Sequence, residues 1–513
     1  MEFKSRLVNL IGNAAYFVEI KTFHSYCLDL LGKIGKSENL KNVVQEATER
    51  IKNQEVELGR ITKTVVVIDE AQDMDSNEYE LIKELMERND EMRVIAVGDD
   101  DQNIYGFRGS DSKYMAELLS EQKSKKYELI DNYRSDKLIV NFSNEFLCLL
   151  KNRLKLEVCR PVSVNEGEVW LVKNNSYLEQ SVVHVMQNTW NTDMDKTVGV
   201  LTSTNEEAYL IARLLSKQGY CVRLIRSNEG FALWDLAEIR FFVNQIQNHE
   251  DLPVISDELW EKSIIELQKV YGTSENLPMC INLLQQFEKT TLKKYYTDFE
   301  AYIRESKFED FIRGGRNEIC VSTIHKSKGR EYDFVYMMLN NTCIDTEEQK
   351  RSIYVGITRA KSKLFICYKH DFLSAIKENT KRAGVCWYFD NKEYQKADEI
   401  VIPLTHEDVH LDFFKDEKRN EVISSLRSGD ELQIIEQKYE TSSAFYFVYH
   451  SFGRDIKVAK GSKKFYGKVC EQRKHGYEPY LARVQYVAIW RDKEEKKEHN
   501  ILLPIVCFRR RNT

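Results

Sequence analysis

Val65-Val66-Val67-Ile68-Asp69-Glu70 and Val94-Ile95-Ala96-Val97-Gly98-Asp99 are two short apolar runs, rich in β-branched residues, that both end in acidic residues. Such runs are typical of strands buried on both faces of a parallel sheet. Between them, Asp75 can cap a helix with Glu78 three residues further on. The stretch therefore predicts a β-α-β unit. Ligands of such sheets bind beyond the carboxyl ends of the strands, where both acidic clusters lie.

A second α/β pattern starts near Tyr127 and is interrupted once. Trp260, Ile264 and Leu267 lie at helical spacing inside the interruption, which is polar and helix-like. After about residue 395 the chain changes to short alternating stretches, which favour a small β-rich module. The segments expected in the second pattern are strands at 198–201, 221–224, 319–322, 334–338 and 364–368 and a helix at 205–217, and those in the module are strands at 431–435, 445–449 and 484–489.

These patterns predict an α/β fold with two doubly wound parallel-sheet domains, a helical insertion and a C-terminal β-rich module. The length of 513 residues fits three or four domains. The expected boundaries are 1–120 for the first domain, 121–237 and 317–375 for the second, 238–316 for the insertion and 395–513 for the module.

Composition excludes several classes of protein. Hydrophobic residues make up 42% and charged residues 30% of the chain, and no apolar run approaches the ~18 residues of a membrane span. The charged N-terminus resembles no secretion signal, so we expect a cytoplasmic protein without a membrane partner. The eleven cysteines include no C-x-x-C pair, which argues against a zinc ribbon. The net charge of -6 means that any nucleic-acid contact must be local.

Asp69-Glu70-Ala71-Gln72-Asp73 is the strongest single motif. An aspartate at a strand end can hold the Mg²⁺ of a bound nucleotide, and the adjacent glutamate can polarise an attacking water. An isolated Asp-Glu pair is more often a solvated turn. The preceding apolar strand and the following Ala-Gln-Asp favour the catalytic interpretation here.

The segment from Gly98 to Gly109 follows the second strand. Gln102 is placed to sense a γ-phosphate, and Tyr105 and Phe107 offer rings on which unpaired bases can stack, at ~1 to 3 kcal/mol per base. The alternative is that these rings belong to the core. Glycine-rich, charged flanks favour exposure.

The D-E-A-Q-D and G-D-D-D-Q-N-I-Y-G-F-R-G stretches resemble motifs II and III of DNA helicases of the UvrD/Rep/PcrA type, in superfamily 1. Further matches follow in the family's order. They are Thr22-Phe23-His24-Ser25-Tyr26, Asn132-Tyr133-Arg134-Ser135, Thr323-Ile324-His325-Lys326-Ser327-Lys328-Gly329-Arg330-Glu331 and Tyr354-Val355-Gly356-Ile357-Thr358-Arg359-Ala360-Lys361. Six motifs in one order, over roughly residues 1 to 372, are a specific signal.

The resemblance implies two RecA-like domains with ATP and Mg²⁺ between them, and movement 3′ to 5′ along single-stranded DNA up to duplex junctions, as in DNA repair. Asp69 is then the metal ligand, Glu70 the activator of water and Arg359 an arginine finger. The implied nucleotide contacts are Gln102, Arg134, Gly329, Glu331 and Arg359, and the implied DNA contacts are Thr22, Phe23, His24, Tyr105, Phe107, Arg108, Thr323 and His325.

The glycine-rich loop G-x-x-x-x-G-K-[ST], which cradles phosphates in this family, does not occur in the sequence. Gly35-Lys36-Ser37 has Leu30 where the first glycine should stand. The opening Met1 to Leu7 resembles the tail of motif Ia. We therefore expect the loop upstream of Met1 or on an upstream polypeptide. The alternatives are a DNA-binding or assembly protein without ATPase activity and a non-motor subunit of a nuclease-helicase complex.

The C-terminal module offers a weaker pattern. Residues 454–474 contain eight Lys or Arg, interleaved with Phe465 and Tyr466. Local phosphate binding and a solvated charged face explain this pattern equally well.

Overall fold

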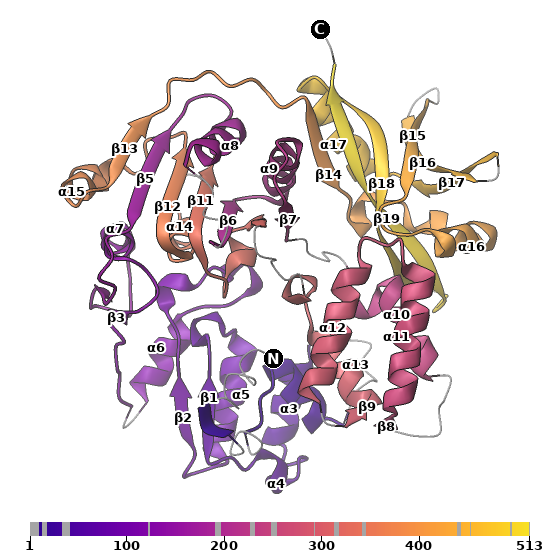
Figure 1. Cartoon of the computed structure of the whole chain (residues 1–513). Helices are drawn as coiled ribbons and strands as arrows, with labels where there is room; N and C mark the ends of the chain where they lie inside the picture. Colours follow the sequence, from indigo (N-terminus) through magenta and orange to yellow (C-terminus); the bar gives the residue numbers. More distant parts are fainter. Residues whose placement is uncertain are drawn as a thin grey trace. The chain divides into compact units, whose positions relative to one another are not determined.

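The structure is a computed structural model (Figure 1). It describes residues 10–12, 18–32, 42–121, 124–189, 196–225, 231–247, 254–291, 293–311, 318–340, 345–438, 443–451, 453–492 and 495–511. The opening Met1 to Leu7 and the Gly35-Lys36-Ser37 stretch lie outside the described residues. Contacts divide the chain into a parallel-sheet unit, Glu19–Ile225 with Gly314–Gln395, and an antiparallel-sheet unit, Met1–Val18 with Arg226–Arg313 and Lys396–Thr513.

The predicted β-α-β unit is confirmed. Strands β1 (Val65–Ile68) and β2 (Arg93–Ala96) pair in parallel, and α5 (Ser76–Glu87) lies between them in the chain. Asp75 and Glu78 form the predicted capping box at the start of α5. The other helices in this part of the chain are α2 (Phe23–Leu30), α3 (Val43–Lys52), α4 (Leu58–Ile61) and α6 (Lys113–Ser120).

One face of this two-stranded sheet is exposed. Ile68 is buried against the helices, whereas the side chains of Val65, Val67 and Ile95 are 48%, 59% and 50% exposed. The prediction that both faces of these strands are buried is therefore wrong for this face. The physical reason is that, in the part of the chain that the structure describes, helices pack against only one side of the sheet.

The second sheet has seven strands in the order β13-β5-β12-β11-β6-β10-β7, and all its pairings are parallel. The five predicted strands are confirmed, and two at one edge were not foreseen. The strands are β5 (Glu168–Lys173), β6 (Val198–Thr202), β7 (Val222–Leu224), β10 (Ile319–Thr323), β11 (Tyr332–Leu339), β12 (Ala360–Tyr368) and β13 (Cys386–Phe389).

Helices cover both faces of the seven-stranded sheet. Tyr336 of β11 lies in a core with α8 (Leu178–Thr189) and α9 (Asn205–Lys217). Its neighbour Met337 points to the opposite face, where α14 (Glu347–Ile357) packs so closely that a Cβ on Gly356 would lie 2.4 Å from the Met337 Cε atom. The smaller elements of this unit are β3 (Asp131–Asn132), α7 (Lys137–Leu147), β4 (Arg160–Pro161) and α15 (Lys377–Arg382).

The antiparallel-sheet unit contains a six-stranded sheet in the order β14-β19-β18-β15-β16-β17. Its strands are β14 (Glu399–Pro403), β15 (Glu431–Lys438), β16 (Ser443–Ser451), β17 (Arg454–Lys460), β18 (Tyr477–Arg491) and β19 (Glu498–Arg510), with α16 (Glu417–Ser425) and α17 (Lys463–Lys474). The interruption forms α10 (Ala237–Gln247), β8 (Val254–Ile255), α11 (Asp257–Tyr271), α12 (Leu277–Thr290), β9 (Lys294–Tyr295) and α13 (Tyr296–Glu305).

The insertion helices and the C-terminal sheet share one hydrophobic core. Tyr486 of β18 shows this directly, because its ring lies 5.1 Å from Phe231 and 5.4 Å from Phe308. Leu236 also forms a β-bridge with Ala488. The insertion and the module are therefore one folded body. Among the described residues, no helix combines the length and the apolar character that crossing a membrane requires.

Candidate functional site

The carboxyl ends of β1 and β2 are tied together by one buried glutamine. The Gln72 side chain donates to the Glu70 carboxylate and accepts a 3.0 Å hydrogen bond from the Asp99 backbone N–H. Glu70 itself lies in the left-handed region, with φ 52°. The left-handed region is unfavourable for a glutamate backbone, so contacts with the surrounding structure must stabilise this conformation. The geometry keeps the exposed carboxylates of Asp69 and Glu70 at the strand end.

Gly98 is required for this arrangement. A Cβ atom at Gly98 would lie 2.3 Å from the Gln72 Oε1 atom and 3.0 Å from the Ala71 backbone nitrogen. A Cβ atom does not approach another heavy atom to 2.3 Å, so any larger residue would displace the Gln72 side chain.

Gln102 and Arg359 meet although 257 positions separate them. The Arg359 Nη2 atom donates to Gln102 Oε1 at 2.8 Å, and Gln102 Nε2 donates to Asp99 Oδ2 at 2.8 Å. Arg359 is 2% exposed, and burial, aided by Arg134, lowers the pKa of its guanidinium to about 10. The carboxylates of Glu70 and Glu331 oppose this shift. Arg359 therefore remains charged at neutral pH within electrostatic reach of Glu70.

Arg134 and Glu331 form an ion pair at the site. The Arg134 Nε atom donates to Glu331 Oε1 at 2.6 Å, and Lys361 lies 3.2 Å from the same carboxylate. Partial burial alone would raise the pKa of Glu331, but Arg134 and Lys361 together lower it. Gly329, two residues before Glu331, has φ 80° and makes the turn that brings Glu331 to this position.

The structure thus brings the predicted nucleotide-site residues close together. Two guanidinium groups offer fixed forks of donors for phosphate oxygens, and an exposed pair of carboxylates offers ligands for Mg²⁺. These are the residue types that bind a nucleoside triphosphate and its metal ion, and such binding here stays a prediction. The members of this group are Asp69, Glu70, Gln102, Arg134, Gly329, Glu331 and Arg359.

Tyr105, Phe107 and His325 form a cluster that we call the aromatic platform. The Tyr105 and Phe107 rings lie 6.2 Å apart, and His325 lies 6.4 Å and 6.1 Å from them. The Arg108 guanidinium stands over both rings, at 5.2 and 5.4 Å. Phe107 is 65% exposed. The alternative that it belongs to the core is therefore wrong.

The other predicted DNA contacts lie at element ends. Thr22 caps α2 by accepting the Ser25 backbone N–H at 3.1 Å, which leaves His24 exposed and Phe23 packed against the core of α2 and α3. Thr323 is buried at the end of β10, two residues before His325. Contact of these residues with DNA stays a prediction.

Family models match most of the parallel-sheet unit. The UvrD/REP helicase N-terminal domain matches residues 59–123, and the UvrD-like helicase C-terminal domain matches 127–252 and 243–371. This chain belongs to the UvrD/Rep-type family of DNA helicases.

Individual helicases of the UvrD/Rep type are also similar to this chain. The ATP-dependent DNA helicase Rep of Buchnera aphidicola (from Acyrthosiphon pisum) is 22% identical over 59% of this chain and 63% of its own length. The ATP-dependent DNA helicase PcrA of Bacillus subtilis is 21% identical over 58% of this chain and 54% of its own. DNA helicase II of Haemophilus influenzae is 21% identical, with shares of 59% and 55%. The chain therefore spans little more than half the length of these relatives.

A solved structure, the C-terminal domain of a possible DNA helicase from Lactobacillus, aligns with 50% of this chain and 98% of its own at 13% identity. Its TM-score of 0.26 is too low to bear on the fold.

Lys328 is a site residue of this UvrD/Rep-type chain that sequence reasoning did not single out. Its Nζ atom donates to Asp73 Oδ2 at 2.6 Å and to the Gln102 carbonyl at 3.2 Å. It also lies 3.7 Å from Glu70 Oε2 and 5.1 Å from the centre of the Tyr105 ring. The sequence signal for Lys328 was its position in the Thr323–Glu331 motif. That position does not reveal that Lys328 pairs with Asp73.

The acidic run Asp99-Asp100-Asp101 brings three carboxylates within 4.8 Å of one another. All three carboxylates accept hydrogen bonds within the fold, Asp99 from the Gln102 side chain at 2.8 Å. Asp101 accepts a forked pair of hydrogen bonds from Arg153, and Asp100 accepts the Leu154 backbone N–H at 2.7 Å. We therefore assign Asp100 and Asp101 a structural role, and Asp69 keeps the predicted metal role.

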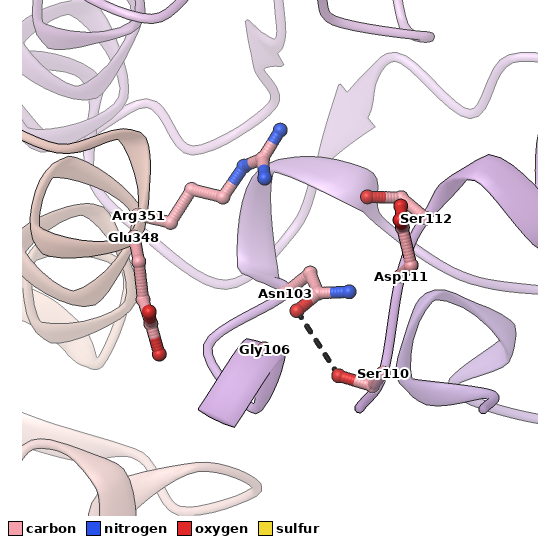
Figure 2. A pocket seen from close by; sticks show the side chains of 7 residues that line it. All are labelled: Asn103, Gly106, Ser110, Asp111, Ser112, Glu348 and Arg351. Carbon is pink, nitrogen blue, oxygen red and sulfur yellow. Dashed lines mark hydrogen bonds between the residues drawn. The ribbon is translucent and has the colours of Figure 1, made fainter. Parts of the chain in front are cut away.

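A polar pocket of about 170 Å³ lies beside the aromatic platform (Figure 2). One wall is formed by Asn103, Gly106 and residues 110–112, and the other by Glu348 and Arg351 of α14. Gly106 lies between Tyr105 and Phe107 in the chain, so the pocket adjoins the platform. Nothing in the sequence patterns indicated this pocket.

Proposed function

We propose that this chain carries the motor of an ATP-dependent DNA helicase or translocase of 3′ to 5′ type, which couples ATP hydrolysis to movement on single-stranded DNA. The observation that carries the proposal is the contact of Arg359 with Gln102, beside Glu70 and next to the aromatic platform. The proposed phosphate-binding group and the proposed base-binding surface are joined through one short segment, residues 102–107.

Bound ATP with Mg²⁺ would supply the phosphoryl transfer that drives movement. Asp69 would hold the metal ion, and Glu70 would orient and deprotonate the attacking water. Gln102 contacts Arg359 directly and so can report phosphate occupancy to it. Arg134 and Arg359 would neutralise charge on the phosphate oxygens, because an arginine fork stays charged and directed.

The aromatic platform would bind single-stranded DNA by stacking, with Arg108 adding charge next to the rings. Duplex junctions are the expected substrates of the movement, and DNA repair in the cytoplasm is the expected setting. We also propose that a polypeptide segment beyond this sequence supplies the phosphate-cradling loop. The exposed apolar face of Val65, Val67 and Ile95 supports this, since a parallel sheet is normally covered on both faces.

Binding and unwinding assays test the proposal. The Tyr105→Ala/Phe107→Ala variant should bind a fluorescent oligo-dT on the order of 30-fold more weakly than the unchanged protein, because two stacking contacts are lost. Tyr388→Ala, which removes another exposed ring, is the matched control. ATP-dependent unwinding should need a 3′ single-stranded tail. Equal unwinding from a 5′ tail would contradict the proposed 3′ to 5′ direction. Unchanged oligo-dT binding by the double variant would show that the aromatic platform is not the DNA-binding surface.

A further inference from the structure

Arg351 is an arginine held at the pocket wall without a partner among the described residues. Its Nε atom is buried and makes no hydrogen bond, and the part of the chain that the structure describes offers the guanidinium no ion pair. Burying an arginine donor unpaired costs free energy, and the guanidinium fork matches phosphate oxygens closely. The Arg351 side chain is therefore positioned to bind an anion.

The nearby carboxylates do not take this role. Asp101 is bonded to Arg153 and Asp100 to the Leu154 backbone, although both lie within electrostatic reach of Arg351. Figure 2 shows the guanidinium turned away from the Glu348 carboxylate. Asp100 and Asp101 stabilise the charge of Arg351 from a distance, and no described residue accepts a hydrogen bond from its guanidinium.

The opposite wall of the pocket is polar and partly neutralised. Ser112 brings a hydroxyl group to it, whereas the Ser110 hydroxyl donates to the Asn103 Oδ1 atom at 3.3 Å (Figure 2). The Asp111 carboxylate accepts the Lys113 backbone N–H at 2.9 Å and lies 3.5 Å from the Lys113 Nζ atom. A hydroxyl donor such as Ser112 opposite an arginine suits a phosphodiester, and the volume of about 170 Å³ admits one.

We propose that this pocket binds one backbone phosphate of the single strand whose bases stack on the aromatic platform, with Arg351 as its principal ligand. This inference rests on the proposed DNA-binding function. Gly106 joins the two features, because it lines the pocket while its neighbours Tyr105 and Phe107 carry the rings. The platform would thus hold bases, and the pocket would fix the register of the backbone.

The test measures oligo-dT affinity by fluorescence anisotropy over a series of salt concentrations. Each phosphate neutralised on a single strand adds about 0.7 to the slope of log affinity against log salt. Arg351→Met should lower that slope by about 0.7 and weaken binding about tenfold at low salt. Arg351→Lys should restore the slope, since it restores the charge.

Lys350→Met is the matched control. It removes the same charge one residue away, but Lys350 is already paired with Glu347 at 2.6 Å, so the slope should stay unchanged. An unchanged slope in Arg351→Met, with binding still lost in Tyr105→Ala/Phe107→Ala, would overturn the pocket proposal alone. Loss of affinity without a change of slope would also overturn it, because it would show a structural role. Failure of the unchanged protein to bind oligo-dT would instead overturn the proposed function.

Discussion

Lys328 Nζ lies 2.6 Å from Asp73 Oδ2 in a position where its side chain is only 9% exposed. The same ammonium group contacts the Gln102 carbonyl and lies over the Tyr105 ring. One side chain therefore joins the acidic strand end to the aromatic platform. His325, which completes the platform, is only three residues earlier in the chain.

This ion pair should be energetically coupled. Lys328→Met leaves the Asp73 carboxylate without its ammonium partner, and Asp73→Asn leaves the ammonium without its carboxylate. A double-mutant cycle by chemical denaturation should give a coupling of about 1 to 3 kcal/mol. The exposed pair of Lys137 and Glu166 should give less than about 1 kcal/mol. Additive effects at Lys328 and Asp73 would show that the contact does not hold the site together.

Arg359→Lys should separate hydrolysis from DNA binding. Lysine keeps a charge but cannot bond Gln102 Oε1 and the Val355 carbonyl together, as Arg359 does at 2.8 and 2.9 Å. We expect the ATPase rate to fall on the order of 1000-fold, with oligo-dT affinity changed less than about twofold. Lys363→Met, paired with Glu168 elsewhere on the sheet, should keep the full rate. A variant Arg359→Lys with normal turnover would exclude the finger role.

The insertion helices and the C-terminal sheet share one core, so the Tyr486 ring should stabilise both segments. Tyr486→Ala removes a buried ring from contact with Phe231 and Phe308 and should destabilise this unit by about 3 to 5 kcal/mol. Proteolysis should then cut both the insertion helices and the C-terminal sheet. Tyr388→Ala, at an exposed ring, should change stability by less than about 0.5 kcal/mol. Cleavage confined to one of the two segments would show that they fold separately.

Glu238 should make the stability of the same unit depend on pH. Burial raises the pKa of its carboxyl above the ordinary value, although Ser274 donates a 2.6 Å hydrogen bond to it. The folded state therefore binds the proton more tightly than the unfolded state. Stability is highest below the unfolded pKa and falls as the pH rises through the folded pKa.

Glu238→Gln should remove this dependence and raise the melting temperature at pH 8, by about 2 to 4 °C for each kcal/mol recovered. At pH 4.5 the variant and the unchanged protein should melt together. Glu300→Gln is the contrasting control, because Glu300 is paired with Arg304 at 2.7 Å and its loss should lower the melting temperature. A lower melting temperature for Glu238→Gln at pH 8 would contradict the assigned cost of this charge.

Local patterns predicted most elements of the fold because they depend on neighbouring residues. Asp75 with Glu78 gave the start of α5, and the helix expected at 205–217 is α9 (Asn205–Lys217). The edge strands β5 and β13 were missed. Their pairing partners lie far away in the chain, and nothing local separates these short apolar runs from other buried segments.

The candidate site also contains residues that the sequence predicted and contacts that it did not. Motif positions indicated Gln102 and Arg359, but not that they touch. No pattern indicated the contact of Lys328 with Asp73, or Arg351, which has no partner in the described part of the chain. Such contacts join side chains from distant segments, so only the folded chain reveals them. The exposed face of β1 and β2 is the opposite case, since a continuous apolar run predicts burial on both faces but cannot say which element provides it.

ATP hydrolysis tests the central claim most directly. The protein would be purified through a tag after Thr513, so that any preceding or accompanying polypeptide is retained, and assayed with and without oligo-dT. We expect turnover that oligo-dT stimulates and that falls at least about 100-fold in Glu70→Gln, with DNA binding intact. DNA binding without turnover, or equal turnover in Glu70→Gln, would contradict the motor function and favour a DNA-binding or assembly protein.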